Sequence, residues 1–151
     1  MKLSILQEDL NKALSTVSRS VSGKSTLPIL SNILMGTENG RLKLAATNLE
    51  VGINLWLGAK IEQEGSITIP ARILNELISS LPAAKIDLEV KELTLFLNAV
   101  NYKINIAGMD SSEFPKVPVF PEEPLVVFDK NELIKSLSQV VISVAQDEGR
   151  P

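Results

Sequence analysis

Apolar and polar residues alternate along this chain with two different periods. A period of two predicts strands, and a spacing of three or four predicts helices. The first half of the pattern predicts a short strand around Leu3 and Ile5, a helix over 8–21, and strands over 29–35, 42–46 and 51–61. The second half predicts a strand over 67–69, a helix that starts at Pro70-Ala71-Arg72 and ends before Pro82, and strands over 86–90, 93–97 and 102–106. The order strand, helix and three strands is thus written twice, which indicates an α+β fold.

Sliding the sequence against itself supports an internal repeat. One shift pairs Leu10 with Leu74 and Asn11 with Asn75. Because any two amphipathic helices align their leucines, two unrelated strand-helix units would also explain this shift. A second shift places the N-terminus on 126–151, and its identities include pairs that amphipathicity does not require: Lys12/Lys135, Ser15/Ser138, Ser20/Ser143 and Pro28/Pro151. The C-terminal stretch is therefore expected to begin a further copy with a strand and a helix.

A proline-rich stretch lies between the second unit and this further copy. Residues 110–124 carry prolines at 115, 118, 121 and 124 together with several charges. Proline at this density blocks both helices and strand ladders, so an extended connector is predicted. A strand and one helix cannot bury a core alone. We therefore expect one whole domain over 1–121 and the truncated start of a second, homologous domain over 122–151.

Composition removes several classes of chemistry. The chain has 151 residues, a net charge of -3, and neither histidine nor cysteine. Disulfides, thiolate zinc sites, cysteine nucleophiles and histidine-based triads are excluded. No apolar run approaches the roughly 20 residues that span a bilayer, and the N-terminus turns polar at Gln7, so no signal-peptide core is present. A cytoplasmic protein without a membrane partner, cofactor or metal is expected.

One segment resembles the end of a phosphate-binding loop. It reads Ser22-Gly23-Lys24-Ser25-Thr26. The full motif needs a glycine five residues before Gly23, where Ser18 stands, and it joins a strand to a following helix, whereas here a helix precedes the loop. A glycine that ends a helix, followed by a basic loop, explains the segment without a nucleotide.

Neighbouring acids are the remaining candidates for catalysis. The pairs are Glu8/Asp9, Glu122/Glu123 and Asp147/Glu148. Such pairs can serve acid-base or Mg²⁺ chemistry, but acids at helix starts more often complement the helix dipole. The run Asp110-Ser111-Ser112-Glu113 indicates a turn or capping box and offers no base for a serine. No catalytic residue is predicted.

Basic residues on the predicted helices are the more informative set. They are Lys12 and Arg19 on the first helix, Arg72 at the start of the second, Lys130 and Lys135 on the third, and Lys24 and Arg150 in loops that follow helices. Their acidic neighbours make a solvated surface of mixed charge the simpler explanation. An acidic protein that binds DNA does so through a local patch, with weak, salt-sensitive phosphate contacts. The six aromatic residues are scattered, which argues against stacking on single strands.

Four words of the sequence occur together in a known order. They are TLPILSNI at 26–33, ATNLE at 46–50, IPAR at 69–72 and EFP at 113–115. In this order and at similar spacing they resemble the first domain of the bacterial sliding clamp family, the beta subunit of DNA polymerase III. Residues 143–151 are similar to the end of the first helix of the family's second domain. The resemblance implies a DNA clamp fold, in which helices line the DNA channel and antiparallel sheets lie outside.

What the resemblance implies is a processivity factor that is not an enzyme. Clamps of this family have three such domains per subunit, and two subunits close into a ring around duplex DNA. The expected partners are double-stranded DNA, a second copy of the subunit, the replicative polymerase and the clamp loader. The pocket that receives peptides of the last two lies mostly outside this chain.

The resemblance also assigns residues. Lys24 and Arg72 match family positions that face DNA, and Gln146 and Arg150 lie in the corresponding loop of the second domain. Lys12, Arg19 and Lys135 are expected DNA contacts from helix placement alone. The ring interface is expected at the edge strand 102–109, with Tyr102, Ile104 and Ile106 as candidates.

Two other classes remain open at this point. One is an enzyme that uses a carboxylate or lysine at a sheet edge, which would need a complete phosphate loop or a convergent set of acids. The other is a structural or protein-interaction repeat without a nucleic-acid role. Lysines and arginines on the outer strands and loops, rather than on the helices, would favour that class.

Overall fold

The structure is a computed structural model that describes residues 1–21, 27–118 and 126–144. Its contacts divide the chain into two compact units, Met1–Pro118 and Val119–Pro151. The predicted boundary between 121 and 122 stays a prediction.

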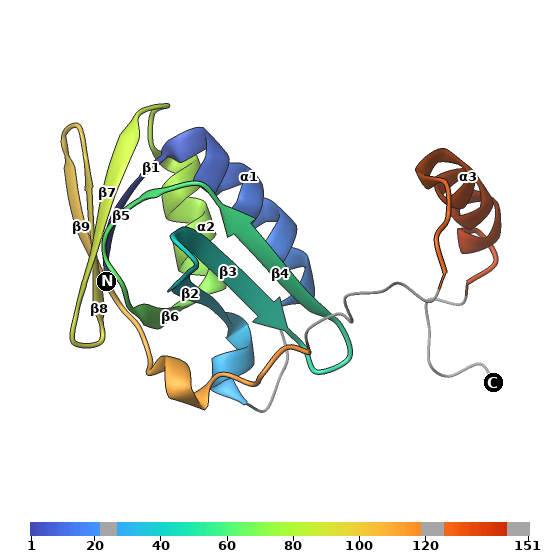
Figure 1. Cartoon of the computed structure of the whole chain (residues 1–151), viewed down its shortest axis with the longest axis horizontal. Helices are drawn as coiled ribbons and strands as arrows, with labels where there is room; N and C mark the ends of the chain where they lie inside the picture. Colours follow the sequence, from blue (N-terminus) through green and yellow to red (C-terminus); the bar gives the residue numbers. More distant parts are fainter. Residues whose placement is uncertain (22–26, 119–125, 145–151) are drawn as a thin grey trace. The chain divides into compact units, whose positions relative to one another are not determined.

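The first unit contains two copies of one order of elements. The first copy is β1 (Lys2–Leu6), α1 (Gln7–Val17), the short 3-10 helices η1 (Ser18–Ser20) and η2 (Pro28–Ser31), β2 (Asn32–Glu38), β3 (Arg41–Thr47) and β4 (Gly52–Leu57). After β5 (Lys60–Gln63), the second copy is β6 (Ser66–Pro70), α2 (Ala71–Ser80), β7 (Lys85–Lys91), β8 (Thr94–Ala99) and β9 (Tyr102–Ala107), followed by the 3-10 helix η3 (Ser111–Glu113). Figure 1 labels these elements. The predicted double unit and the α+β class are confirmed.

The two copies exchange their first strands. One sheet has the order β5-β1-β7-β8-β9 and the other the order β4-β3-β2-β6, and every pairing within them is antiparallel. The strand that opens the first copy, β1, thus pairs with β7 of the second, while β6 of the second pairs with β2 of the first. Neither copy can form its sheet without the other, so the repeat folds as one domain.

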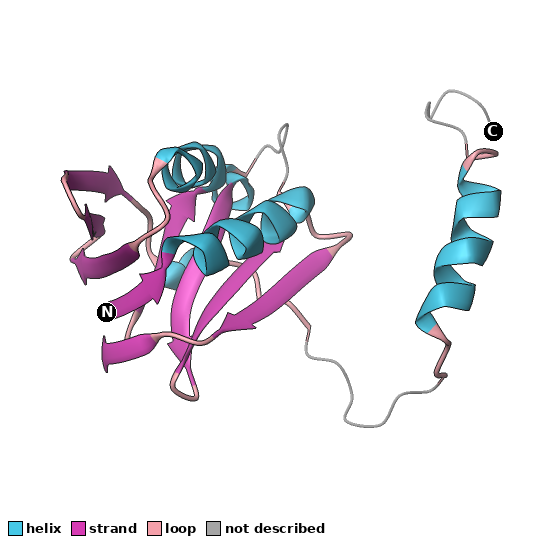
Figure 2. Cartoon of the chain, turned by 90° about the horizontal axis from the view of Figure 1, so that it is seen from above, coloured by secondary structure: helices cyan, strands magenta, loops and turns pink. Residues whose placement is uncertain are grey.

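A single core joins both sheets and both helices. Positions that the repeat aligns are buried alike: Leu3 with Ile67, Ile5 with Ile69, Leu10 with Leu74, and Leu14 with Ile78. Each of these side chains is at most 5% exposed. Figure 2 shows the two helices lying next to each other over the strands. Burial of one apolar stripe leaves the opposite stripe of each helix in solvent.

The turn between β2 and β3 is a two-residue hairpin. Glu38 pairs with Arg41, and the two residues between them, Asn39 and Gly40, have φ angles of 51° and 70°. Positive φ at both central residues is the requirement of a type I′ hairpin turn, which asparagine followed by glycine meets best.

The single strand predicted over 51–61 is wrong. The chain forms two strands here, which belong to different sheets: β4 pairs with β3 through Leu57↔Leu42, whereas β5 pairs with β1 through Ile61↔Leu3. The break falls at Gly58 and Ala59. The odd-numbered residues of both strands face the core, so the alternation of apolar and polar residues continues across the break. The period alone therefore does not reveal that the chain passes from one sheet to the other.

Two predicted element ends also differ. The strand predicted from Ile29 begins at Asn32, because Pro28 opens a 3-10 turn that the Leu30 N–H closes on the Leu27 carbonyl. The helix predicted to reach Val21 ends at Val17. There the Ser20 hydroxyl lies 3.1 Å from the carbonyl oxygens of both Val17 and Ala46, as the chain tightens into η1.

The connector packs back onto the first unit. Asp110 caps η3, since its side chain accepts a hydrogen bond from the Ser112 N–H at 2.8 Å, as the predicted turn requires. Beyond it, Phe114 joins Ile29, Leu30 and Ala45 in a small second apolar cluster. Val117 lies so close to β4 that a Cβ on Gly52 would be 2.6 Å from its Cγ1. The connector is therefore anchored at least to Val117.

The second unit contains the helix α3 (Lys130–Val141). Asp129 caps it by accepting hydrogen bonds from the N–H groups of Asn131 and Glu132. The strand predicted before this helix is wrong: residues 126–129 form no regular structure. A strand needs a neighbour that completes its hydrogen bonds, and among the described residues none pairs with 126–129.

Candidate nucleic-acid interface

The solvent face of α1 carries an ordered row of polar side chains. Leu10, Leu14 and Val17 are fully buried on the opposite face. At 3.6 residues per turn, the stripe opposite these three contains Glu8, Lys12, Ser15 and Arg19, and all four are exposed. The predicted position of Lys12 on the first helix is confirmed, and its side chain is exposed. Arg19, predicted on the same helix, instead belongs to η1 directly after α1, where it is also exposed.

The solvent face of α2 is built in the same way. Leu74 and Ile78 are buried, and the exposed residues are Arg72, Ile73, Glu76, Ser79 and Ser80. Pro70 precedes the helix, so Arg72 lies in its first turn. The predicted helix start at Pro70-Ala71-Arg72 is confirmed.

The two helices run in opposite directions. The side-chain amide of Gln7, at the start of α1, donates to the carbonyl of Ile78 near the end of α2 at 2.7 Å. At the other end, η1 packs against α2. This arrangement places Arg19 and Arg72 at the same end of the helix pair, while Glu8 and Asp9 lie at the opposite end. The helix faces are thus basic at one end and acidic at the other.

Arg72 is held by an acid on its own helix. Its Nε donates to Oε1 of Glu76 at 2.8 Å, one helical turn away, and the two side chains are 88% and 66% exposed. The hydrogen bond and charge of Glu76 raise the pKa of the guanidinium further above its already high value. The remaining four N–H bonds of the guanidinium, on the two terminal nitrogens, have no protein partner among the described residues. Arg72 can therefore donate to a phosphate while it keeps Glu76.

Lys12 and Arg19 differ from Arg72 in this respect. No ion pair involves either side chain in the described ranges, although Glu8 lies one turn before Lys12. The internal repeat aligns Glu8 with Arg72 and Lys12 with Glu76. The same two helix positions thus carry one acid and one base in both copies, in reversed order. Sequence reasoning noted these acids only as neighbours, and the i, i+4 spacing was the signal that would have identified the pair in α2.

The other expected DNA contacts divide into two groups. Lys24, Gln146 and Arg150 lie outside the described residues. Lys130 and Lys135 lie on α3 and are exposed.

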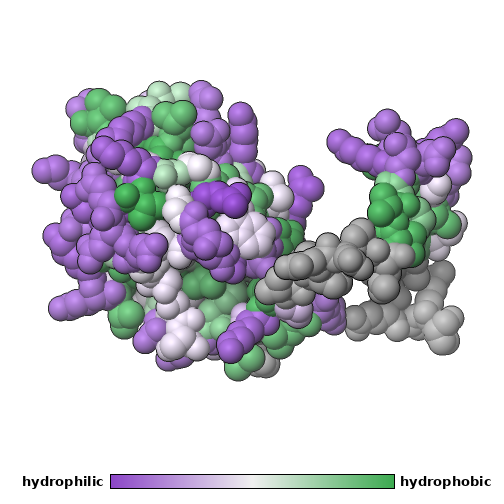
Figure 3. Space-filling view, in the orientation of Figure 1, coloured by the Kyte–Doolittle hydropathy of each residue, from purple (hydrophilic) through white to green (hydrophobic). Residues whose placement is uncertain are grey.

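The outer surfaces of the sheets also carry lysines, but most of them are neutralised. Lys2 pairs with Glu62, Lys43 with Glu38, Lys85 with Asp87, and Lys91 with Glu89, at 2.7 to 3.2 Å. In Figure 3 hydrophilic residues cover the region of β7, β8 and β9. Lysines on the strands were the feature that would favour a protein-interaction repeat. Their pairing with acids makes these surfaces a mosaic of both signs.

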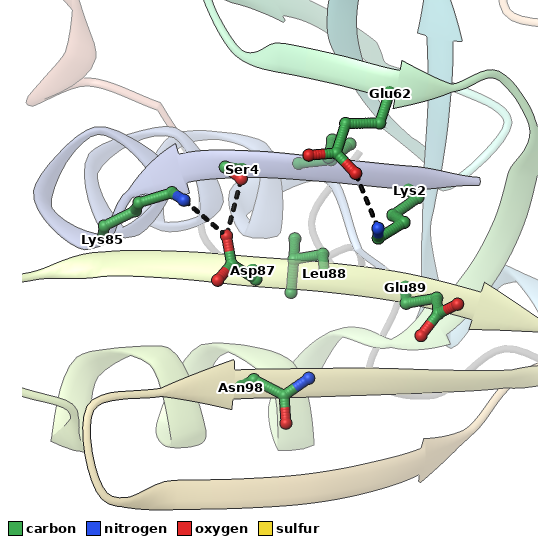
Figure 4. Close-up of a pocket in the computed structure, with 9 residues that line it drawn as sticks. Lys2, Ser4, Glu62, Lys85, Asp87, Leu88, Glu89 and Asn98 are labelled. Carbon is green, nitrogen blue, oxygen red and sulfur yellow. Dashed lines mark hydrogen bonds and ion pairs between the residues drawn. The ribbon is translucent and has the colours of Figure 1, made fainter.

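A shallow pocket of about 270 Å³ on the five-stranded sheet tests the enzyme alternative. Figure 4 shows Ser4, Lys85 and Asp87 converging in it, next to the pair of Lys2 and Glu62. The Ser4 hydroxyl donates to Asp87 at 2.6 Å, and this bond, followed by that of Lys85, lowers the pKa of the Asp87 carboxyl. A carboxylate whose pKa is lowered and which also pairs with a lysine is a weak base, so it does not activate Ser4 as a nucleophile. The cluster stabilises the sheet surface.

Metal and membrane sites give no alternative in the described part of the chain. No three acidic side chains there gather as a metal ion would need. No helix of residues 1–21, 27–118 and 126–144 combines the length and apolarity needed to cross a membrane.

The interface strand predicted over 102–109 is too long: β9 ends at Ala107, and Met109 instead bridges to Thr68 of β6 in the four-stranded sheet. β9 forms one border of the five-stranded sheet. Among the strands of the described residues, β9 pairs with β8 alone. Tyr102 is 48% exposed and Ile104 is partly buried, whereas Ile106 belongs to the core at 5% exposure. Ile106 can therefore contribute to an interface through its strand but not through an exposed side chain.

The free edge of β9 has a defined hydrogen-bonding phase. The Gly108 N–H donates to the Leu93 carbonyl at 2.7 Å, and Leu95 lies opposite Ile106. Because hydrogen-bonded pairs alternate in an antiparallel ladder, residues 102, 104 and 106 bond to β8, while the main-chain groups of Lys103, Asn105 and Ala107 point away from it. This edge is a template for one further strand.

Comparisons with known proteins agree with this geometry. Residues 1–118 match the family described as "DNA polymerase III beta subunit, N-terminal domain". The "Beta sliding clamp" of Synechococcus elongatus is 32% identical over 98% of the chain, and that of Bacillus subtilis is 28% identical over 100%. The chain spans 40% and 42% of the length of these two relatives.

Solved structures show the same fold. The DNA polymerase III subunit beta from Pseudomonas aeruginosa superposes with a TM-score of 0.90 at 30% identity, over 99% of this chain and 41% of that one. The DNA polymerase sliding clamp from Bacillus subtilis superposes with a TM-score of 0.93 at 26% identity, over 100% of this chain and 42% of that one. The clamp fold implied by the sequence resemblance is confirmed, and the chain belongs to the DNA polymerase III beta subunit family.

Proposed function

We propose that this chain is the N-terminal part of a DNA sliding clamp, a processivity factor that encircles duplex DNA and tethers the replicative polymerase to its template. The observation that carries the proposal is the match of residues 1–118 to the N-terminal domain of the DNA polymerase III beta subunit. Since the chain spans about two fifths of its relatives, the ring and its activity belong to the longer protein.

The helix faces support this role on physical grounds. A sliding protein must attract the phosphate backbone without binding one sequence, and it does so through positive charges that ignore base edges. Exposed Lys12, Arg19 and Arg72 supply such charges, while Glu8 and Glu76 on the same faces limit the attraction. Mixed charge of this kind keeps DNA near the helices without holding it at one position.

The proposed role requires no catalysis. The function of a clamp is topological: it keeps a second protein close to DNA, so its site needs neither a nucleophile nor a base. The pairing of Asp87 with Ser4 and Lys85, described above, supports a structural use of the most convergent polar cluster. The polymerase and the clamp loader are the proposed protein partners, and chromosomal replication implies a cytoplasmic site of action.

Ring closure is proposed to use the free edge of β9. A second subunit that adds a strand there would satisfy the main-chain groups of Lys103, Asn105 and Ala107. Tyr102, at the start of the strand, would contribute its exposed ring. Ile104 and Ile106 would then act mainly by fixing the strand to the core.

The decisive experiment compares circular and linear DNA. The complete gene product, loaded onto a nicked circular plasmid, is expected to stay bound through gel filtration and to be lost when a restriction enzyme linearises the plasmid. A protein bound by local contacts would be retained equally on both forms, and equal retention would overturn the proposal. A linear plasmid blocked at both ends by bound proteins is the control, and retention on it should be restored.

A further inference from the structure

Glu76 occupies a position from which it can control the principal cation of α2. Its Oε1 accepts from Nε of Arg72 at 2.8 Å, and the contact joins consecutive turns of the helix. Both side chains are more than half exposed, so neither charge needs the other to compensate for lost solvation. Its place on the open face of α2, away from Leu74 and Ile78, argues against a role in the core.

The contact leaves a specific part of Arg72 available. Glu76 accepts from Nε, which is the N–H nearest the backbone, and the two terminal nitrogens remain directed away from that bond. A phosphate that binds them comes to lie roughly 5 Å from the Glu76 carboxylate, and two like charges at that distance in water repel by an energy equivalent to about a fourfold change in affinity. The ordering of Arg72 by an exposed i, i+4 pair has a smaller effect. Repulsion therefore outweighs the benefit of ordering.

The comparison within the chain points the same way. Lys12 and Arg19 have no ion-pair partner among the described residues, so Arg72 is the helix cation that is restrained. Its partner occupies the position that the repeat aligns with Lys12, where a second base would have strengthened binding. Glu76 therefore weakens the attraction of DNA phosphates to Arg72, at the end of the helix pair where Arg19 and Arg72 lie.

We propose that Glu76 is a positioning residue that limits the hold of Arg72 on DNA phosphates and so keeps the contact weak enough for sliding. The proposal rests on the DNA-binding role proposed above. It predicts that removal of the charge of Glu76 tightens binding to duplex DNA, and that this gain requires Arg72.

The test is a double-mutant cycle on this chain, with a fluorescent duplex of random sequence titrated at low salt. Glu76→Gln is expected to bind roughly two to four times more tightly than the unsubstituted chain. Arg72→Ala is expected to bind the duplex more weakly. When Glu76→Gln is added to Arg72→Ala, the affinity should rise by no more than it does when a distant carboxylate is neutralised. Glu92→Gln, in the turn between β7 and β8, supplies that remote control.

The salt dependence separates positioning from a merely structural role. Without the opposing charge of Glu76, Arg72 neutralises a phosphate more completely, which should steepen the slope of log K against log salt by up to about 0.9 for one phosphate. A change in stability alone would leave this slope unchanged, and far-ultraviolet circular dichroism checks that each variant is folded.

The outcomes distinguish the two proposals. Suppose that Arg72→Ala weakens binding, but Glu76→Gln does not tighten it more than Glu92→Gln does. The role of Glu76 is then overturned, while the DNA-binding role stands. If the chain does not bind duplex DNA, or if Arg72→Ala leaves binding unchanged, the assignment of Arg72 fails, and the role of Glu76 fails with it.

Discussion

The side-chain amide of Gln7 donates a hydrogen bond to the main-chain carbonyl of Ile78 at 2.7 Å, and both residues are buried. The N–H of Gln7 also donates to the carbonyl of Ala84 at 2.9 Å. One residue at the start of α1 thus satisfies two carbonyls at the end of α2 and beyond. This contact fixes the antiparallel arrangement that brings Arg19 and Arg72 to one end of the helix pair.

Gln7→Leu is expected to destabilise the fold by about 1 kcal/mol, because the buried Ile78 carbonyl loses its side-chain donor and keeps only the longer bond from the Leu81 N–H at 3.3 Å. Urea denaturation followed by circular dichroism measures the loss. Gln63→Leu, on the exposed strand β5, is the matched control and should change the free energy of unfolding by no more than about 0.5 kcal/mol. An equal effect of both substitutions would show that the buried bond is not the cause.

Lys24→Ala combined with Arg72→Ala is expected to weaken binding to duplex DNA and to reduce its salt dependence. Each lost phosphate contact lowers the slope of log K against log salt by about 0.9. Lys60→Ala combined with Lys103→Ala removes the same charge from the strands and is the matched control, since neither lysine forms an ion pair in the described ranges. Equal losses in both double variants would instead favour attraction by overall charge.

Periodicity predicted the elements of this fold well because each strand and helix exposes one face. Leu10 and Leu74, aligned by the repeat, are indeed equivalent core residues. The crossing at Gly58 was missed for a physical reason: β4 and β5 bury residues of the same parity, so alternation continues while the hydrogen-bonding partner changes from β3 to β1. Sheet membership depends on pairing partners, which the period does not contain.

The candidate site was predictable in position but not in chemistry. The helical spacing placed Lys12 and Arg72 on open faces correctly. It did not reveal that Arg72 is paired with Glu76 whereas Lys12 stands without an ion pair in the described part of the chain, because rotamers decide which of several neighbouring charges meet. Likewise, the alternation that marked Ile106 as a strand residue could not tell whether its side chain faces the core or a partner.

The fluorescence of Trp56 is expected to report on the ionisation of Glu38. The indole N–H donates to the Glu38 carboxylate, Lys43 pairs with the same carboxylate at 3.1 Å, and together these contacts lower the pKa of Glu38 below its ordinary value. A carboxyl whose pKa is lowered by folding stabilises the fold when ionised. Its contribution is complete above the ordinary glutamate pKa of about 4.3 and is lost as the pH falls through the folded value.

Acid titration of the emission of Trp56, which is the single tryptophan of the chain, measures this directly. Glu38→Gln should remove the transition and leave a flat profile between about pH 5 and the acid unfolding of the chain. Glu50→Gln, in the turn before β4, should retain the transition. A transition that survives in Glu38→Gln would assign it to another carboxyl.

Asn105→Pro is expected to weaken ring closure of the complete gene product while the domain stays folded. Proline lacks the N–H that Asn105 directs away from β8, so it removes a donor from the free edge and none from the existing ladder. Ile104→Pro, one residue earlier, removes an N–H that bonds to β8 and should destabilise the sheet. The first variant thus removes an N–H donor from the free edge of β9, and the second removes one from the side that faces β8.

Sedimentation velocity of the complete gene product gives the oligomeric state, and urea denaturation of this chain gives stability. Asn105→Pro should shift a dimer toward the monomer with little loss of stability, and Ile104→Pro should lower stability in the chain itself. Tyr102→Ala tests the side-chain contribution separately, because its ring is half exposed and leaves the ladder intact. A dimer of undiminished stability with proline at position 105 would contradict pairing through this edge, because an added strand loses the hydrogen bond of the Asn105 N–H and meets the proline ring there.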